Sequence, residues 1–199
     1  MKSSLLFLFV LYLTGCIPIM INENDYRGLK EEDKWFIKPF KLGIENQRVD
    51  FSDSLFLYEL STNNIKEVVK HHPLTWIHLW RPFCHAEQCQ NIDYYSSIED
   101  RFIEQGLRVL VVSETYDYND IRGVVNNSMW NKPIFVLQDS YFGHKIRKNR
   151  LKLTEEITAD SVVKTKWGFD DYLFKGSKLL FAGNTLDKEK IDSLLLLNK

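Results

Sequence analysis

Two apolar runs in the middle of the chain constrain its fold more than any other feature. The first, Leu74–Trp80 (LTWIHLW), is rich in β-branched and aromatic residues, and the second, Leu107–Ser113 (LRVLVVS), is almost entirely aliphatic. Runs of this kind are typical of strands that are buried inside a sheet. The residues between them repeat with helical periodicity from Ile92 to Phe102 and stop at Gly106. A strand, a helix and a second strand in this order predict an α/β fold.

Further predicted elements extend this pattern on both sides. The first run is preceded by a strand within Asp53–Leu60 and a helix over Ser61–His72. The second run is followed by a polar helix from Asn119 to Met129, a strand in KPIFVLQD, a short helix in LTEEITADSV, two strands in DYLFKGSKLLFAG and a leucine-rich helix at the end. We therefore expect an α/β sheet with helices on both faces.

The first sixteen residues, MKSSLLFLFVLYLTGC, are typical of an export signal. Lys2 gives a short positive start, and Leu5–Leu13 is an apolar run that is too short to span a bilayer comfortably. The run ends in Leu-Thr-Gly-Cys, which resembles a bacterial lipobox, the pattern cleaved before a cysteine that carries lipid. We predict a lipoprotein signal peptide over residues 1–15 and lipidation, including palmitate, at Cys16. The alternatives are a buried helix and a signal peptide cut elsewhere.

Lipidation at Cys16 would anchor the protein to an inner or an outer membrane of the bacterial cell envelope, with its domain outside the cytoplasm. Disulfides persist in that compartment. The lipid would use one of the three cysteines, which leaves Cys84 and Cys89 as a pair. We expect residues 16–45, which include the polar stretch INENDYRGLKEEDK, to form a lipidated tether, and residues 46–199 to form one domain.

The charge of the chain argues against one class of partner. The sequence has 26 basic and 27 acidic residues, which are well mixed, and its formal net charge is −1. Because no basic stripe is present, nucleic acid is not an expected partner. Aromatic residues make up 14% of the chain, which indicates a globular rather than a disordered protein.

The spacing of Cys84 and Cys89 in FCHAEQCQ limits how the two thiols can interact. Residues five apart in a helix have Cα atoms about 8.7 Å apart, whereas a disulfide needs roughly 4.4–6.8 Å. A continuous helix through both would therefore forbid the bond, and forming it requires the first turn to bend or unwind. On spacing alone the pair can be a redox couple, a structural disulfide, two metal ligands or two unrelated buried thiols.

A buried strand that ends at Trp80, followed by Arg81-Pro82-Phe83-Cys84 at the start of a helix, resembles the active-site region of the thioredoxin-like superfamily. GLRVLVVS is similar to the next strand of that family, and DYLFKGSKLLFAGNTLDKEKIDSLL to its last hairpin and helix. The resemblance spans roughly residues 55–197 and is, in particular, to the lipid-anchored redoxins of bacterial envelopes. It implies a three-layer α/β/α sandwich with a central mixed β-sheet, and thiol-disulfide exchange with protein partners without a cofactor.

In such a site Cys84 would attack and Cys89 would resolve the mixed disulfide. A helix N-terminus lowers the pKa of a thiol placed there, which favours Cys84 as the nucleophile. The residues expected around the two thiols are Trp80, Pro82, Phe83 and His85. The sequence departs from the family in its C-x-x-x-x-C spacing, and no proline precedes the final hairpin in WGFDDYLF.

The four-residue gap between the cysteines has its own parallel. This segment also resembles peroxiredoxins of the bacterioferritin-comigratory, or Q, type through Pro82, Cys84, Cys89 and GLRVLVVS. That resemblance implies a thiol peroxidase in which Cys84 becomes a sulfenic acid and the helix unwinds before Cys89 condenses with it. Arg81 replaces the threonine of that motif. A third alternative is a non-catalytic thioredoxin-like lipoprotein in which the disulfide is structural.

Other polar residues have plainer interpretations. No buried Asp or Lys stands out as a proton acceptor in the first strand of the domain, and Glu59 is the nearest candidate. His78 on its apolar strand is expected to be a core or sheet-edge histidine. A metal site that combines the two cysteines with the histidine between them is possible in principle, but we predict none. The basic cluster Lys145–Lys152 is expected to be a solvated face. The predicted function is a membrane-anchored thiol-disulfide oxidoreductase whose partners are protein thiols or disulfides.

Overall fold

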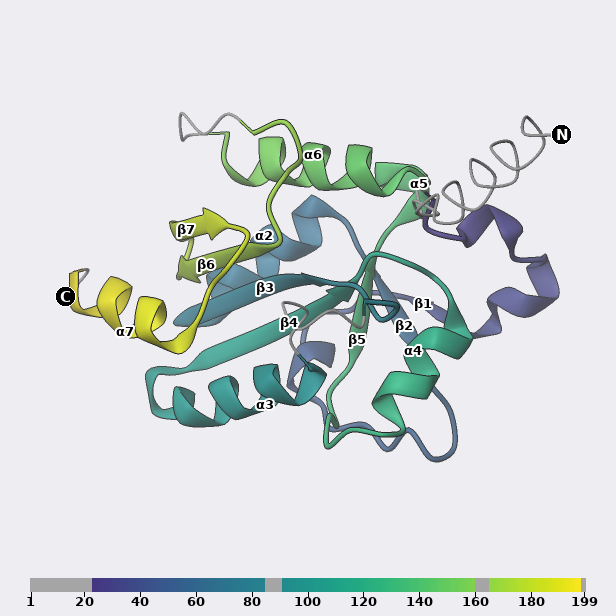
Figure 1. The fold of residues 1–199 in the computed structure, drawn as a ribbon, viewed down its shortest axis with the longest axis horizontal. Coiled ribbons are helices and arrows are strands. Elements are labelled where there is room, and N and C mark those ends of the chain that lie inside the picture. Colours follow the sequence, from purple (N-terminus) through teal and green to yellow (C-terminus); the bar gives the residue numbers. More distant parts are fainter. Residues whose placement is uncertain (1–22, 85–90, 160–164, 198–199) are drawn as a thin grey trace, which may run out of the picture.

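One seven-stranded sheet crosses the domain in the order β1-β2-β5-β4-β3-β6-β7 (Figure 1). The computed structural model describes residues 23–84, 91–159 and 165–197. The strands are β1 (Ile37–Pro39), β2 (Leu57–Leu60), β3 (Leu74–Trp80), β4 (Leu107–Ser113), β5 (Ile134–Leu137), β6 (Asp171–Lys175) and β7 (Lys178–Gly183). β1 to β5 run parallel to one another, whereas β6 is antiparallel to both β3 and β7. The predicted mixed sheet is confirmed.

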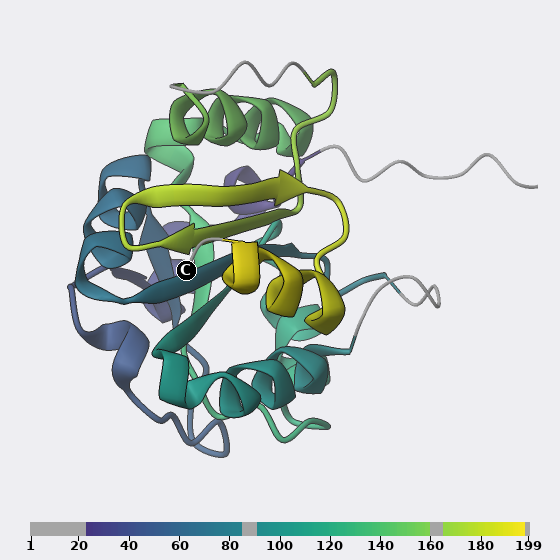
Figure 2. The same ribbon diagram turned by 90° about the vertical axis from the view of Figure 1, so that its left-hand side faces the viewer.

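Helices cover both faces of the sheet (Figures 1 and 2). They are α2 (Thr62–His71), α3 (Ile92–Arg101), α4 (Tyr118–Val125), α5 (Asp139–Phe142), α6 (Ile146–Ile157) and α7 (Lys188–Leu197). The core residues of α3, α4 and α7 pack with one face of the strands, around Trp76 and Val109. Those of α2, α5 and α6 pack with the other face, around Ile77 and Leu110. This arrangement is the three-layer α/β/α sandwich that the sequence predicts.

The local signals in the sequence explain where several elements begin and end. The hydroxyl of Ser61 accepts a hydrogen bond from the backbone N–H of Asn64, and the Asn64 side chain accepts one from the backbone N–H of Ser61. This reciprocal cap satisfies two donors that the first turn of α2 would otherwise leave unpaired. After α3 and the short 3-10 turn Ile103–Gln105, Gly106 adopts a left-handed conformation with φ of 74° and leads directly into β4.

The segment expected to be a tether is instead part of the domain from residue 23 onward. Short 3-10 turns (Tyr26–Gly28, Glu31–Phe36 and Ile44–Asn46) flank β1, which pairs in parallel with β2. Phe36 is buried in the core, and the buried Glu45 carboxylate lies 3.1 Å from His72. The expected domain boundary at residue 46 is therefore wrong, because apolar residues and strand pairing fix this polar stretch to the sheet. The predicted signal peptide and Cys16 lie outside the described residues.

The basic cluster predicted as a solvated face is also partly inside the fold. α6 begins at Ile146, earlier than the short helix expected from LTEEITADSV, and so includes most of Lys145–Lys152. Arg147 stacks over the Trp167 ring at 3.8 Å, and the Arg150 side chain points into a cluster of charged groups described below. Within the described ranges, no helix is long and apolar enough to cross a membrane.

Candidate functional site

Cys84 lies in a tight turn that begins where β3 ends. Its backbone N–H donates to the carbonyl oxygen of Arg81 over 3.1 Å, which closes a β-turn across Pro82 and Phe83. Pro82 is buried, whereas Phe83 and Cys84 are half-buried. Cys84 is disulfide-bonded, and the cysteine at the other end of the bond lies outside the described residues.

Two of the predicted site residues, His85 and Cys89, also lie outside the described residues, so their placement beside Cys84 stays a prediction. Trp80 directly precedes the turn and its side chain is packed in the core, so its expected role beside the thiols stays a prediction. The helix predicted from the periodicity of the sequence, α3, begins only at Ile92, and the Asn91 side chain caps it. The helix N-terminus that the sequence predicts at Cys84 is therefore not that of α3.

A cavity of about 220 Å³ opens beside this turn. Its walls come from the end of β3, from α3, from the start of β6 and from the segment between β7 and α7. The lining residues are His78, Leu79, Trp80, Arg81, Tyr95, Asp170, Asp171, Asn184, Thr185 and Leu186. The cavity lies at the carboxyl end of β3, and ligands of open α/β sheets generally bind outside the carboxyl ends of the strands.

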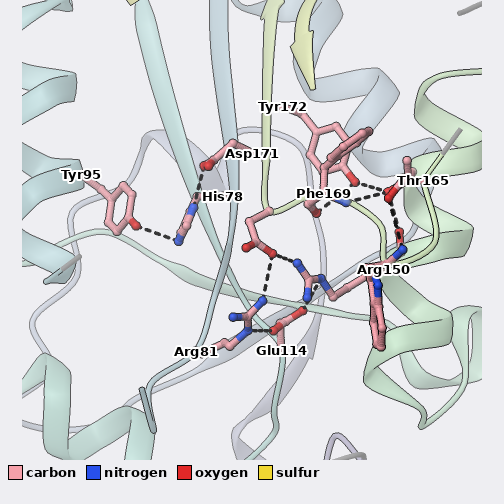
Figure 3. A network of polar contacts seen from close by, with 12 residues as sticks. His78, Arg81, Tyr95, Glu114, Arg150, Thr165, Phe169, Asp171 and Tyr172 are labelled. Atoms are coloured by element: carbon pink, nitrogen blue, oxygen red, sulfur yellow. Dashed lines mark hydrogen bonds and ion pairs between the residues drawn. The ribbon is translucent and has the colours of Figure 1, made fainter. Parts of the chain in front are cut away.

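His78 lies between a carboxylate and a tyrosine hydroxyl at this cavity (Figure 3). Its Nδ1 is 2.7 Å from Asp171 Oδ1, and its Nε2 is 2.7 Å from the Tyr95 hydroxyl. The tautomer that satisfies both contacts has a proton on Nδ1, which donates to Asp171, and a lone pair on Nε2, which accepts from Tyr95. Trp76 Nε1 donates to the same carboxylate oxygen over 2.9 Å. We call Tyr95, His78 and Asp171 the Tyr-His-Asp chain.

The positions of these three residues follow from the sheet. His78 in β3 and Asp171 in β6 are register partners, so their side chains lie on the same face. Tyr95 reaches them from α3, which packs on that face, and its ring stacks on the imidazole with centroids 4.3 Å apart. Burial raises the pKa of Tyr95, and the negative charge of Asp171 raises it further, so the hydroxyl remains protonated at neutral pH.

A second group of polar residues, the ion cluster, fixes the start of the Cys84 turn. Arg81 donates through Nε to Glu114 over 2.5 Å and through Nη2 to Asp170 over 3.0 Å. Arg150 from α6 contacts the same two carboxylates, with its Nε 3.1 Å from Glu114 Oε1 (Figure 3). Burial lowers the pKa of Arg150, and Glu114 opposes this effect. The ion cluster thus ties the ends of β3 and β4 to α6 and to the segment before β6.

Glu59, the candidate proton acceptor from the sequence, does not lie at this site. It belongs to β2, and β5 and β4 separate that strand from β3. Its carboxylate accepts a hydrogen bond from the Tyr116 hydroxyl over 2.9 Å, and burial raises its pKa. In the part of the chain that the structure describes, no group of three or more His, Cys, Asp or Glu residues could hold a metal ion.

Sequence reasoning missed most of the polar residues at the cavity. The sequence predicts His78 to be a core or sheet-edge histidine, and it places Tyr95 only on the apolar face of a helix. One signal was available: in LTWIHLW, strand alternation places His78 on the same face as Trp76 and Trp80, where a polar ring needs a partner. The identity of that partner, Asp171, depends on the pairing of β3 with β6.

No family model matches the chain, and no curated protein matches it. Three solved structures are similar in fold: a thioredoxin-like protein from Aeropyrum pernix (17% identity, TM-score 0.40, covering 69% of this chain and 82% of that one), a thioredoxin-like protein from Bacteroides caccae (19%, 0.38, 64% and 41%) and the thioredoxin domain of a thiol-disulfide oxidoreductase from Bacteroides vulgatus (15%, 0.41, 67% and 84%). Likenesses at these identities concern the fold alone and assign no role to any residue.

Proposed function

We propose that the protein is a thiol-disulfide oxidoreductase that acts through the disulfide of Cys84. The observation that supports it is the position of this residue. Cys84 is half-buried and disulfide-bonded, and it lies in the turn that leaves the carboxyl end of β3, beside a cavity lined by groups that can move protons. A disulfide in such a place is accessible to a partner thiol, whereas a disulfide buried in the core is not.

The proposed reaction exchanges one disulfide for another. A thiolate of the partner attacks a sulfur of the protein disulfide, the new S–S bond forms, and the electron pair of the old bond leaves with the other sulfur. A second thiol of the partner then attacks the first partner sulfur in this mixed disulfide and releases the cysteine of the protein. The protein thereby gains two electrons and two protons, and the two partner thiols become a disulfide. We propose Cys89 as the cysteine bonded to Cys84, because it is the remaining cysteine once Cys16 carries lipid.

A redox titration tests this proposal. The full chain is equilibrated in glutathione buffers of graded potential, its thiols are alkylated, and the state of each cysteine is measured by mass spectrometry. We expect Cys84 to equilibrate within the range of the buffers. A disulfide that stays oxidised to below about −300 mV would identify the non-catalytic alternative with a structural disulfide.

Matched serine variants separate the two thiols. Cys89→Ser leaves Cys84 as the only thiol of the pair, so it should accumulate mixed disulfides with partner proteins. Cys84→Ser should accumulate far fewer. Equal accumulation by both variants would contradict the proposed order of attack and resolution. Peroxide consumption by the reduced protein, with Cys84→Ser as the control, tests the peroxidase alternative in the same samples.

We also propose that the mature chain is lipidated at Cys16 and anchored to a membrane of the cell envelope. The support is the sequence MKSSLLFLFVLYLTGC, in which the positive residue, the apolar run and the Leu-Thr-Gly-Cys pattern follow one another in the order of a lipoprotein signal. Expression with labelled palmitate should label the wild type and Cys84→Ser but not Cys16→Ser. Label in Cys16→Ser would contradict the proposal.

A further inference from the structure

We propose that an aromatic patch, made of Trp35, Phe56 and Tyr118, contacts the surface of the membrane that holds the lipid of Cys16. Trp35 lies in the 3-10 turn before β1, Phe56 directly precedes β2, and Tyr118 begins α4. The inference rests on the proposed anchoring at Cys16, which it deepens by naming the face of the domain that meets the lipid headgroups.

The aromatic patch is a continuous surface that the core holds in place. Trp35 is 51% exposed, whereas the next residue, Phe36, is buried. The Trp35 ring lies 6.2 Å from the Phe56 ring and 5.6 Å from the Tyr118 ring, between ring centroids, and these two rings are half-buried. Phe36 packs against Tyr118 from the core side, with centroids 4.8 Å apart. An exposed tryptophan supported in this way presents a fixed apolar surface to a partner.

The chemistry of the aromatic patch fits the interface between lipid and water. Lys38 Nζ lies 5.0 Å from the centre of the Phe56 ring, and the guanidinium of Arg122 lies 5.8 Å from that of Tyr118. Tryptophan and tyrosine are enriched at membrane–water interfaces, where their rings lie at the level of the headgroups. Long basic side chains beside them keep their charge in water while their stems cover apolar surface. The aromatic patch combines both features.

Net charge does not select this face. The turn that carries Trp35 has three acidic residues at its start. Glu31 pairs with Lys34 over 2.6 Å, and Glu32 lies 3.9 Å from Lys30. The attraction of these lysines to anionic lipid is therefore offset within the turn. We expect the contact to depend on the ring of Trp35 rather than on the charge of the lipid.

The length of chain between the anchor and the domain limits how far this face can stand from the bilayer. Glu23, the first described residue, is seven residues after Cys16. Seven residues span at most about 25 Å, whatever their conformation. Three residues after Glu23, the Tyr26 ring lies 4.4 Å from the Nζ of Lys34, the residue before Trp35. Trp35 is therefore on the part of the domain that the anchor holds near the membrane, beside β1 and α4 (Figure 1).

Trp167 is the other exposed tryptophan of the chain, and the aromatic patch is favoured over it. Trp167 is 55% exposed, but the guanidinium of Arg147 lies over its ring at 3.8 Å and covers one face. The length of the tether alone does not separate the two surfaces, because Glu23 forms a β-bridge with Lys145, near Arg147. Trp167 is therefore the matched control for Trp35.

The test uses the tryptophan fluorescence of the full lipidated chain in phosphatidylcholine vesicles, with and without bromine near the headgroup end of the acyl chains. Bromine quenches only the tryptophans that it approaches closely. Three of the five tryptophans are at most 4% exposed and out of reach of lipid, namely Trp76, Trp80 and Trp130. We expect brominated lipid to quench the wild type. Trp35→Phe should lose most of this quenching, and Trp167→Phe should keep it.

Flotation with the vesicles measures the anchor separately, with Cys16→Ser as the control that stays in solution. If the wild type does not float, the anchoring and the docking both fail. If it floats but Trp35→Phe is quenched as strongly as the wild type, the docking face is wrong while the anchoring stands. Quenching that is lost in Trp167→Phe instead would also overturn the proposal. So would quenching that requires phosphatidylglycerol or disappears in about 1 M salt, because basic side chains would then make the contact.

Discussion

The substitution Glu114→Gln removes one negative charge from the centre of the ion cluster while it preserves the shape of the side chain. The Glu114 side chain is 1% exposed and contacts two guanidinium groups, those of Arg81 at 2.5 Å and Arg150 at 3.1 Å. In the wild type the two arginines face two carboxylates, and the variant leaves Asp170 as the remaining carboxylate for both. One positive charge is then uncompensated in a largely buried place.

The size of the effect follows from burial. Removing one partner of a fully buried ion pair costs about 3–5 kcal/mol, whereas an exposed pair contributes about 1 kcal/mol or less. Arg81 is 31% exposed and can turn partly toward water, so the lower end of the buried range applies. We expect Glu114→Gln to lower the free energy of unfolding by about 3 kcal/mol. For a domain of this size, that corresponds to about 6–12 °C in Tm.

Urea unfolding at low and at high salt measures this loss. Glu104→Gln makes the same chemical change at an exposed position, and it should stay within about 0.5 kcal/mol of the wild type. Because the contacts of Glu114 are shielded from solvent, its loss should persist when salt is raised to about 1 M. A loss below about 1 kcal/mol, or one that disappears in salt, would refute the view that the ion cluster anchors the Cys84 turn.

Three further predictions concern the scaffold. Ser61→Ala removes the cap of α2 and should cost about 1 kcal/mol in urea unfolding, whereas Ser61→Asn should retain most of it. Gly106→Ala should cost about 1–3 kcal/mol, because an added Cβ would lie 2.8 Å from Pro73 at a φ of 74°, and an unchanged Tm would contradict this strain. Burial raises the pKa of Glu59 in the folded state above its value in the unfolded chain. The free energy of unfolding of the wild type should therefore fall as the pH rises and Glu59 loses its proton in the folded state. Thermal unfolding should therefore show Glu59→Gln to be more stable than the wild type at neutral pH but not below pH 4.5. An equal gain in Tm at the two pH values would exclude ionisation of Glu59 as the cause.

The elements of the fold were largely predictable because their signals are local. The apolar run Leu74–Trp80 predicts β3 with its observed bounds, and the Ser61 cap and Gly106 mark the ends of α2 and of the turn before β4. β1 was missed because a three-residue strand has too short a pattern, and its formation depends on pairing with β2. The polar residues before β1 favoured a tether, because the strand pairing that docks this stretch on the sheet is not visible in the sequence.

The site was predictable only where it is continuous in sequence. The turn from Arg81 to Cys84 follows β3, so its place at the end of a strand could be inferred. Glu114 and Arg150, in contrast, meet Arg81 only through the packing of β4 and α6 around β3. A charged side chain that faces solvent and one that packs inside the protein look alike in a sequence, because burial depends on contacts with residues far along the chain. The Lys145–Lys152 cluster was assigned to solvent for this reason.

The order of the sheet has a consequence for how the chain folds. β3 and β4 are neighbours both in sequence and in the sheet, so this half can form early through a short connection. Among the described strands, the partners of β2 are β1 and β5, and β5 is synthesised after α2, β3, α3, β4 and α4. The edge of the sheet formed by β1 and β2 therefore joins the rest late, and closing the long loop between β2 and β5 costs more conformational entropy. The strand that leads to Cys84 can consequently be in place before the N-terminal segment docks, and that segment should be the first to open in amide hydrogen exchange.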